Sequence, residues 1–267
     1  MSSATGWRVW WLGVRPRTLG AGLVPVIVGT AAAGEVIWWR LVAAAFVAAG
    51  LQIGVNLAND YFDGVRGVDT HERVGPPRLT QSGAATPRAV LVAALLSIAV
   101  AGFAGLGLGE VMVFVFFGLA ATCGTSFVMV ETVTAASWWC GAVMGLLAVA
   151  ILEANNIRDI GTDEAAGKRT LAVRLGEPHA RALFGTMVVG AFGTIVAGVL
   201  AHLLDASVGM TQWGLVGLAA WPLAIQPLEA ARIASGRALI PVLVGTAKLH
   251  AATGLLLSLG LVLSHTV

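Results

Sequence analysis

Eight apolar stretches, each close to the length of a membrane-spanning helix, constrain the fold of this chain more than any other feature. A helix crosses the hydrocarbon core of a bilayer with about 17 to 25 mainly apolar residues. The stretches are Leu19–Ile37, Leu41–Ala58, Ala89–Leu106, Val111–Val130, Trp138–Ala154, Ala182–Leu204, Trp213–Leu228 and Ile240–Leu263. Charged residues make up only 11% of the sequence, against roughly 25% in a soluble domain. We therefore predict an all-α, polytopic transmembrane helical bundle around a central cavity, built as a single domain over residues 1–267.

The placement of the basic residues predicts how the bundle is oriented. Lysine and arginine gather in four segments, residues 8–17, 66–88, 158–181 and 232–237, whereas the other connections are poor in both. Loops rich in Lys and Arg stay in the cytoplasm, so we expect all four on the cytoplasmic side of the cell membrane. The net charge is only +2, which gives no reason to expect a nucleic-acid partner.

Two polar clusters interrupt the apolar pattern, each at the end of a stretch that is predicted to face the cytoplasm. The first cluster contains Asn56, Asn59, Asp60, Asp63, Arg66 and Asp69, and the second contains Glu153, Asn155, Asn156, Arg158, Asp159, Asp163, Lys168 and Arg169. Residues three, four and seven positions apart share one face of a helix. Each cluster therefore places amides and carboxylates on one helix face, so the two clusters share the same arrangement of polar side chains.

Carboxylates at this density near a membrane need water or a cation. One charged side chain at the centre of a bilayer costs about 3 kcal/mol on insertion scales. Asp and Asn oxygens suit Mg²⁺, which keeps water and phosphate ligands beside one or two carboxylates. The pattern therefore predicts two Mg²⁺ ions that bridge one diphosphate. The predicted metal ligands and catalytic residues are Asp60, Asp63, Asp159 and Asp163, with Asp69 as a further candidate.

Two further sets of residues complete the predicted site. Basic side chains near the clusters can neutralise the phosphate oxygens that the metals leave free. They are Arg66, Arg78, Lys168 and Arg169. Amide side chains are expected to orient the carboxylates or to bind the diphosphate. They are Asn56, Asn59, Asn155 and Asn156. Such a site makes the ionisation of an allylic diphosphate feasible, and the apolar helices can enclose its isoprenoid chain.

Other interpretations of the polar clusters are open. The acidic residues could cap helix ends and be solvated there, although two clusters with matching faces and basic neighbours fit that interpretation poorly. A secondary transporter also carries paired polar interruptions, but near the midplane of the membrane rather than beside basic loops. Glu153 could serve as a base for an acceptor substrate or as the partner of an arginine, and both roles stay open.

The residue order within the two clusters resembles that of a known family. Asn59-Asp60-x-x-Asp63 and Asn155-Asn156-x-Arg158-Asp159-x-x-x-Asp163 are similar to the paired aspartate motifs of UbiA-type prenyltransferases. The resemblance implies Mg²⁺-dependent transfer of a polyprenyl group from its diphosphate to an aromatic acceptor. The interval from Asp63 to Asp69 and the run Gly167–Gly176 are similar to the branch that acts on 1,4-dihydroxy-2-naphthoate. For that branch the resemblance implies loss of CO₂ and a demethylmenaquinone product. The alternative is another aromatic acceptor, such as 4-hydroxybenzoate.

The number of predicted spans between the two clusters conflicts with a shared site. Both clusters must lie on one side of the membrane to bind one diphosphate, so an even number of crossings has to separate them. Three stretches do so, at Ala89–Leu106, Val111–Val130 and Trp138–Ala154. Because UbiA-type enzymes usually have nine spans, we predict that this chain lacks about one helix together with a Tyr- and Gly-rich loop. The alternative is that one of the three stretches is re-entrant or does not cross fully.

Overall fold

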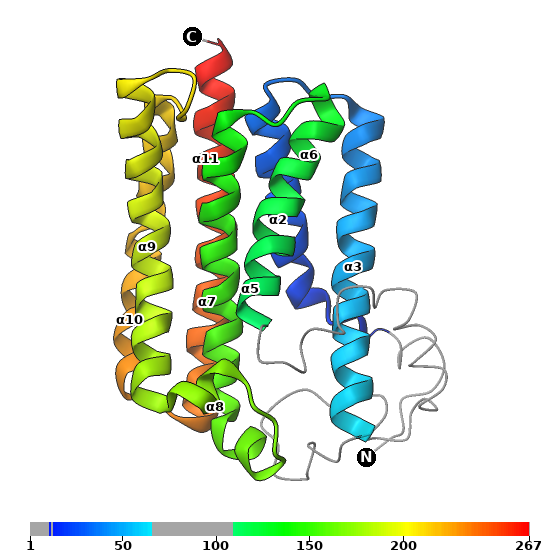
Figure 1. The fold of residues 1–267 in the computed structure, drawn as a ribbon, viewed down its shortest axis with the longest axis vertical. Coiled ribbons are helices and arrows are strands. Elements are labelled where there is room, and N and C mark those ends of the chain that lie inside the picture. The colour runs from blue at the N-terminus through cyan, green and yellow to red at the C-terminus, as the bar shows by residue number, and fades with distance from the viewer. Residues whose placement is uncertain (1–10, 12, 66–108, 267) are drawn as a thin grey trace.

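The computed structural model describes residues 11, 13–65 and 109–266, and all regular structure within these ranges is helical. In chain order the helices are η1 (Pro16–Thr18), α2 (Leu19–Ala33), α3 (Trp38–Val65), α5 (Gly109–Val113), η3 (Phe114–Ala120), α6 (Ala121–Val130), α7 (Ala135–Ala165), α8 (Leu171–Leu175), α9 (Glu177–Leu204), η4 (Gln212–Ala220), α10 (Pro222–Ile233), η5 (Gly236–Leu239) and α11 (Ile240–Thr266). The longer helices stand side by side (Figure 1), which confirms the predicted helical bundle.

Five of the described segments are long and apolar enough to cross a membrane. They cover Trp38–Leu57, Gly109–Val130, Ala135–Ala165, Glu177–Leu204 and Gly236–Thr266. The second of them joins α5, η3 and α6 into one continuous helical segment, and α2 is a shorter apolar helix. The chain is therefore an integral membrane protein. Each predicted stretch falls largely on described helices except Ala89–Leu106, which lies outside the described residues.

The stretch Trp213–Leu228, predicted as one span, is divided at Trp221 into a 3-10 helix, η4, and the α-helix α10. Proline has no N–H to donate, and its ring collides with the carbonyl four residues earlier, so a helix seldom continues through it. Pro222 instead stands at the start of α10, where an N–H would have no partner within the helix. By contrast, Pro25 and Pro227 are accommodated inside α2 and α10.

Helices α3 and α6 lie side by side and run in opposite directions. Arg40, near the start of α3, donates through Nη1 to the backbone oxygens of Val128 and Met129, at 2.8 and 2.9 Å, near the end of α6. Its Nη2 also pairs with the exposed carboxylate of Glu131, at 3.3 Å. The end of α3 and the start of α5 therefore lie towards the opposite end of the bundle (Figure 1).

Helix α7 occupies the centre of the bundle and packs against α2, α9, α11 and η3. Its fully buried Met144 and Leu147 belong to the main hydrophobic core. The contact with η3 depends on glycine, because a Cβ on Gly118 would lie 2.4 Å from Cα of Gly145 and 2.6 Å from the backbone oxygen of Gly141. Small residues of this kind let membrane helices approach closely through their backbones.

Both polar clusters lie at the same end of the bundle. Helix α7 begins just after α6 ends and runs back in the direction of α3, so the last turns of α3 and α7 lie at one end (Figure 1). The start of α5 faces the same end, and it contacts the second cluster directly through Glu110 and Asn156. A single diphosphate site shared by both clusters requires this arrangement.

Candidate functional site

Asn56 connects the first cluster to the chain segment that precedes α2. Its Nδ2 donates to the backbone oxygen of Val14 and to Oγ1 of Thr18, both at 2.9 Å. Its Oδ1 accepts a long hydrogen bond, 3.4 Å, from Nε2 of Gln52 one turn earlier. Both N–H groups of this buried amide are therefore used inside the protein. In this structure Asn56 holds α3 in place, and its predicted contact with substrate stays a prediction.

Asp60 brings a carboxyl group into the interior at the end of α3. Its side chain is only 1% exposed, whereas the neighbouring Asn59 is exposed. A buried carboxylate is costly unless other groups compensate its charge. Asp63 follows on the same helix, but its side chain is not among those described. Arg66, Asp69 and Arg78 lie outside the described residues, so their predicted roles are untested.

In the second cluster, Arg158 forms a two-pronged ion pair with Asp159. Nε of Arg158 donates to Oδ1 of Asp159 at 2.8 Å, and Nη2 donates to Oδ2 at 2.6 Å. The same Nη2 donates to Oδ1 of Asn155 at 2.8 Å, and Asn155 donates to Asp159 at 3.5 Å. This geometry is the strong form of a charged hydrogen bond. Asn155 thus bonds to both members of the ion pair, and its predicted part in a diphosphate site stays a prediction.

Asp163 is buried and is paired with a lysine that a tight turn brings back to it. The turn uses Gly167 at φ +70°, a conformation that glycine adopts without strain. The backbone N–H of Lys168 donates to the backbone oxygen of Asp163 at 2.8 Å, and Nζ lies 3.5 Å from Oδ1. Arg169, next along the chain, is exposed. Asp159 and Asp163 therefore each lie beside a basic side chain, Arg158 and Lys168 respectively. The predicted contact of Lys168 and Arg169 with phosphate stays a prediction.

Asn156 points to a residue that the sequence reasoning missed. Its Nδ2 donates to Oε1 of Glu110 at 2.9 Å. Glu110 is 7% exposed and Glu153 is fully buried. The only sequence signal for Glu110 is an acidic residue at the start of an apolar stretch. That signal alone resembles an ordinary helix end.

The donor set suits Mg²⁺ better than a metal that needs several protein ligands. Among the described residues, no group of three or more His, Cys, Asp or Glu side chains could hold a metal ion. Mg²⁺ commonly takes one or two carboxylates and completes its shell with water and phosphate. The carboxylates of Asp60, Asp159 and Asp163, at one end of the bundle, fit that requirement in their chemistry.

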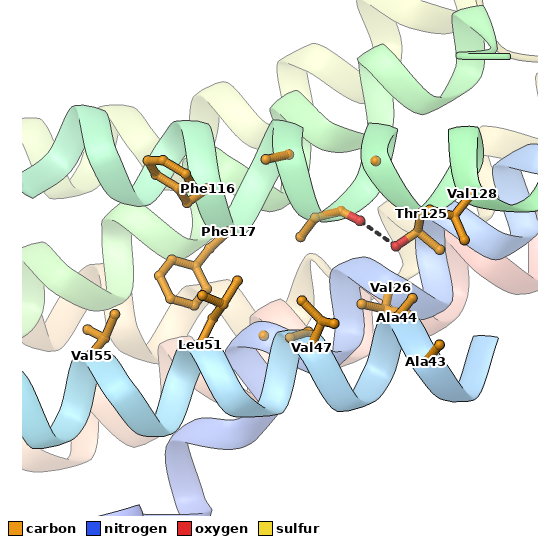
Figure 2. A pocket seen from close by; sticks show the side chains of 15 residues that line it. Val26, Ala43, Ala44, Val47, Leu51, Val55, Phe116, Phe117, Thr125 and Val128 are labelled. Carbon is orange, nitrogen blue, oxygen red and sulfur yellow. Dashed lines mark hydrogen bonds between the residues drawn. The ribbon is translucent and has the colours of Figure 1, made fainter. Parts of the chain in front are cut away.

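An apolar cavity extends from this end along α3. It has a volume of about 340 Å³ and lies between α2, α3, η3 and α6. Figure 2 shows Val55, Leu51 and Val47 on one wall and Phe116 and Phe117 opposite them. The hydroxyl of Thr125 also lines the cavity, but it donates to the backbone oxygen of Ala121 at 2.6 Å. A cavity with such walls accepts a hydrocarbon chain and offers little to a polar group.

Comparison with known proteins gives one consistent result. The profile of the UbiA prenyltransferase family matches residues 103–238, which include the second cluster. A 1,4-dihydroxy-2-naphthoate octaprenyltransferase of Mycobacterium tuberculosis is 40% identical over 274 aligned positions, which cover 88% of this chain and 90% of the relative. The protein of the same name from Escherichia coli is 34% identical over 306 positions, covering 97% of this chain and 96% of the relative. A solved apo structure of a UbiA homolog from Aeropyrum pernix K1 superposes with a TM-score of 0.66 at 17% identity, covering 92% and 97% of the two chains.

The alignment with the Escherichia coli relative also shows a difference in length. Its 306 positions exceed the 267 residues of this chain, so at least 39 of them have no residue here. A membrane-spanning helix needs about 20 residues. The shortfall is therefore large enough for one helix and a long loop.

Proposed function

The chain belongs to the UbiA prenyltransferase family, and on that premise we propose that this membrane prenyltransferase acts on 1,4-dihydroxy-2-naphthoate in menaquinone biosynthesis. The observation that carries the proposal is the identity of 34 to 40%, over most of both chains, to enzymes named for that acceptor. The ring carbon attacks the allylic carbon, and the diphosphate leaves with the electrons of the C–O bond. The electrons of the C–CO₂ bond then restore the aromatic ring, so the products are CO₂, diphosphate and a demethylmenaquinol, the reduced hydroquinone form of demethylmenaquinone.

We place the diphosphate at the end of the bundle where both clusters lie. Asp60 with Asp63, and Asp159 with Asp163, are the residues that would hold Mg²⁺, which supplies the positive charge that a leaving diphosphate needs. Arg158 and Lys168 support this placement, because each already stands beside a motif aspartate. When the aspartates engage a cation, these two side chains can turn their N–H groups to phosphate oxygens.

The remaining basic residues that we assign to the diphosphate are Arg66, Arg78 and Arg169. Arg169 is exposed beside Lys168, from where its long side chain can reach the same ligand. Asn59 is likewise exposed, next to Asp60. The exposure of Asn59 and Arg169 fits side chains that bind a ligand rather than side chains that stabilise the fold.

The isoprenoid chain has a matching place in the apolar cavity. Val55, which lines the cavity, lies five residues before Asp60 on α3, and the lining continues along that helix to Ala43. At 1.5 Å per residue, the helix from Asp60 to Ala43 is about 25 Å long. A diphosphate at the aspartates could therefore direct its hydrocarbon chain along this wall. The four basic segments favour the cytoplasmic side of the plasma membrane for the diphosphate end.

Prenyl transfer by the purified chain in lipid nanodiscs tests this function. With an all-trans polyprenyl diphosphate, 1,4-dihydroxy-2-naphthoate and MgCl₂, we expect one demethylmenaquinol, which air oxidises to demethylmenaquinone for detection, and one CO₂ per turnover. Asp60→Ala and Asp159→Ala should each reduce turnover at least about a hundredfold, since each removes a carboxylate placed at the leaving group. Asp205→Asn is the matched control, because Asp205 is exposed in the loop after α9 and its carboxylate accepts hydrogen bonds only from Ser207 among the described residues. Turnover in EDTA, or by both alanine variants at the wild-type rate, would refute the mechanism.

The acceptor is tested in the same preparation. Faster prenylation of 4-hydroxybenzoate than of 1,4-dihydroxy-2-naphthoate, or transfer without release of CO₂, would assign the chain to another branch of the family. The transporter interpretation no longer competes, because the family membership identifies the chain as a prenyltransferase.

A further inference from the structure

An arginine lies at the end of the apolar cavity that is far from the diphosphate. Along α3 the lining of the cavity begins at Val55 and ends at Ala43, and along α6 it ends at Val128 (Figure 2). Arg40 precedes Ala43 by three residues on α3, and residues three apart share one face of a helix. The side chain of Arg40 therefore stands just beyond the last residues that line the cavity.

Arg40 bonds to carbonyl groups at the end of α6. Its Nη1 donates to the backbone oxygens of Val128 and Met129 at 2.8 and 2.9 Å. The last four carbonyl groups of a helix have no N–H partner inside that helix, and the negative end of the helix dipole favours a cation nearby. Helix α6 ends at Val130, followed by Glu131 at φ +60°. A guanidinium on α3 is therefore well suited to hold this end of α6.

These bonds set the spacing of the two helices at the far end of the cavity. Val128 lines the cavity and also accepts from Arg40 through its backbone oxygen. Within the described ranges, Arg40 provides every hydrogen bond that joins α3 to α6. Along the cavity itself the walls are mainly apolar, and apolar contacts are non-directional. The ion pair with Glu131 adds little, because that carboxylate is 77% exposed.

The position of Arg40 corresponds to the distal part of a bound isoprenoid chain. From Asp60 to Arg40, α3 is about 30 Å long, close to the thickness of the hydrocarbon core. The exposed Trp39, whose ring centre lies 5.5 Å from Cζ of Arg40, fits the aromatic belt at the interface opposite both clusters. With C–C bonds of about 1.5 Å, the four chain carbons of one isoprene unit extend about 5 Å. A chain of about five or more units therefore reaches Ala43, whereas a chain of two units ends well short of it.

We propose that Arg40 determines selectivity for long isoprenoid chains, because it holds α3 against α6 where the distal isoprene units lie. The inference deepens the proposed function and rests on it. Arg40 is remote from the diphosphate and from the reacting carbon, so it is a positioning residue. Without its bonds the start of α3 can move away from α6, and the distal units then lose contact with one wall. The first two units keep their contacts, because they lie about 20 Å from Arg40 along α3.

The test measures kcat/KM for octaprenyl and for geranyl diphosphate in the full chain in nanodiscs. In Arg40→Ala the value for octaprenyl diphosphate should fall about tenfold, roughly the effect of two methylene groups that are no longer buried. The value for geranyl diphosphate should stay within about twofold of wild type. Arg40→Lys keeps the charge but not the planar set of donors, so it should lose only part of the selectivity. Glu131→Gln removes only the exposed ion pair, so this matched control should change neither value.

Two kinetic outcomes would overturn the inference. An equal loss for both diphosphates in Arg40→Ala would mean that the substitution weakens the fold as a whole, and unchanged values for both would mean that the bonds have no part in selectivity. If Arg40→Ala did not fold, Arg40→Lys would decide in the same way, with a smaller change in the ratio.

Spin labels test the connection between α3 and α6 independently of activity. Val42→Cys on α3 and Phe127→Cys on α6 place two labels at exposed positions, and both native cysteines are buried. The distribution of distances between the labels should broaden in Arg40→Ala and stay narrow in Glu131→Gln, and an unchanged distribution in Arg40→Ala would overturn the inference. If the wild type transferred no prenyl group, the proposed function would fail by itself. Binding of both diphosphates in MgCl₂, measured by calorimetry, would then replace kcat/KM.

Discussion

At the scale of single residues, substitution of Arg158 tests whether the charge of the Asp159 carboxylate must be neutralised for activity. The guanidinium of Arg158 donates to both carboxylate oxygens of Asp159 and to Asn155. Arg158→Ala would leave a largely buried carboxylate without its two-pronged partner. We expect kcat/KM for the diphosphate to fall about tenfold, a loss that is moderate because Asp159 is 16% exposed to solvent. Arg158→Lys keeps the charge but loses the planar pair of donors, so it should recover only part of the loss.

The control for this prediction is Arg232→Ala, which removes an exposed arginine from α10 and should leave kcat/KM within about twofold of wild type. Steady-state kinetics in nanodiscs are measured together with the thermal midpoint of each variant. The midpoint distinguishes a variant with a damaged site from one that is unfolded. Wild-type kinetics in Arg158→Ala would mean that the ion pair has no part in the reaction.

The site could be predicted from the sequence only where the signal was local. The spacing within the second cluster predicted that Asn155 and Asp159 share a helix face, and they bond to each other there. The partners of Asn56 and Asn156 were not predictable in this way. Thr18 is 38 residues away from Asn56 and Glu110 is 46 residues away from Asn156, and helical periodicity says nothing about contacts between helices.

At the scale of helices, the packing of η3 on α7 yields a prediction about stability. Gly118→Ala would place a methyl group 2.4 Å from the backbone of Gly145, which cannot move aside as a flexible side chain can. We expect a lower thermal midpoint, since forcing such contacts costs about 1–3 kcal/mol. Gly193→Ala on α9 meets nothing within 4 Å, so it should leave the midpoint unchanged or slightly higher. Equal midpoints in the two variants would contradict the close contact.

The apolar cavity yields a prediction about the preference of the enzyme for isoprenoid chain length. Gly124 lines the cavity, and a Cβ there would meet nothing within 4 Å. Gly124→Phe should fill part of the space, so the ratio of kcat/KM for octaprenyl over geranyl diphosphate should fall about tenfold. Gly193→Phe, on a helix outside the cavity, should leave that ratio unchanged. An equal loss for both chain lengths in Gly124→Phe would place the isoprenoid chain elsewhere.

Helix boundaries were less predictable than helix positions. Apolar length placed the end of the membrane span at Ala154, but α7 continues to Ala165 and carries the whole aspartate motif. The helical spacing of the second cluster, rather than hydropathy, predicted that this last part is helical. Near Pro222 apolar length did not reveal the change from the 3-10 helix η4 to the α-helix α10.

At the scale of the whole molecule, the directions of the described helices bear on the number of crossings. Helices α3 and α6 are antiparallel neighbours, so the chain leaves α3 and enters α5 towards the same end of the bundle. An even number of crossings must therefore separate Val65 from Gly109. That segment contains a single stretch of membrane length, Ala89–Leu106, and two crossings need about 40 apolar residues.

We therefore expect residues 66–108 to leave and re-enter on one side of the membrane, which was the alternative to an eighth full span. A relative with nine spans would have two crossings between the helices that correspond to α3 and α5. In the alignment with the Escherichia coli relative, at least 39 positions have no residue here, which is enough for one helix and its loop.

Single cysteines test this expectation, because the native Cys123 and Cys140 are buried and should not react. Ser82→Cys and Gly107→Cys should react with an impermeant maleimide from the same side as Ser235→Cys, which follows α10. Ala206→Cys, at an exposed position in the loop after α9, should react only from the other side. Labelling of Ser82→Cys and Gly107→Cys from opposite sides would show that Ala89–Leu106 crosses, and would contradict the antiparallel placement of α3 and α6.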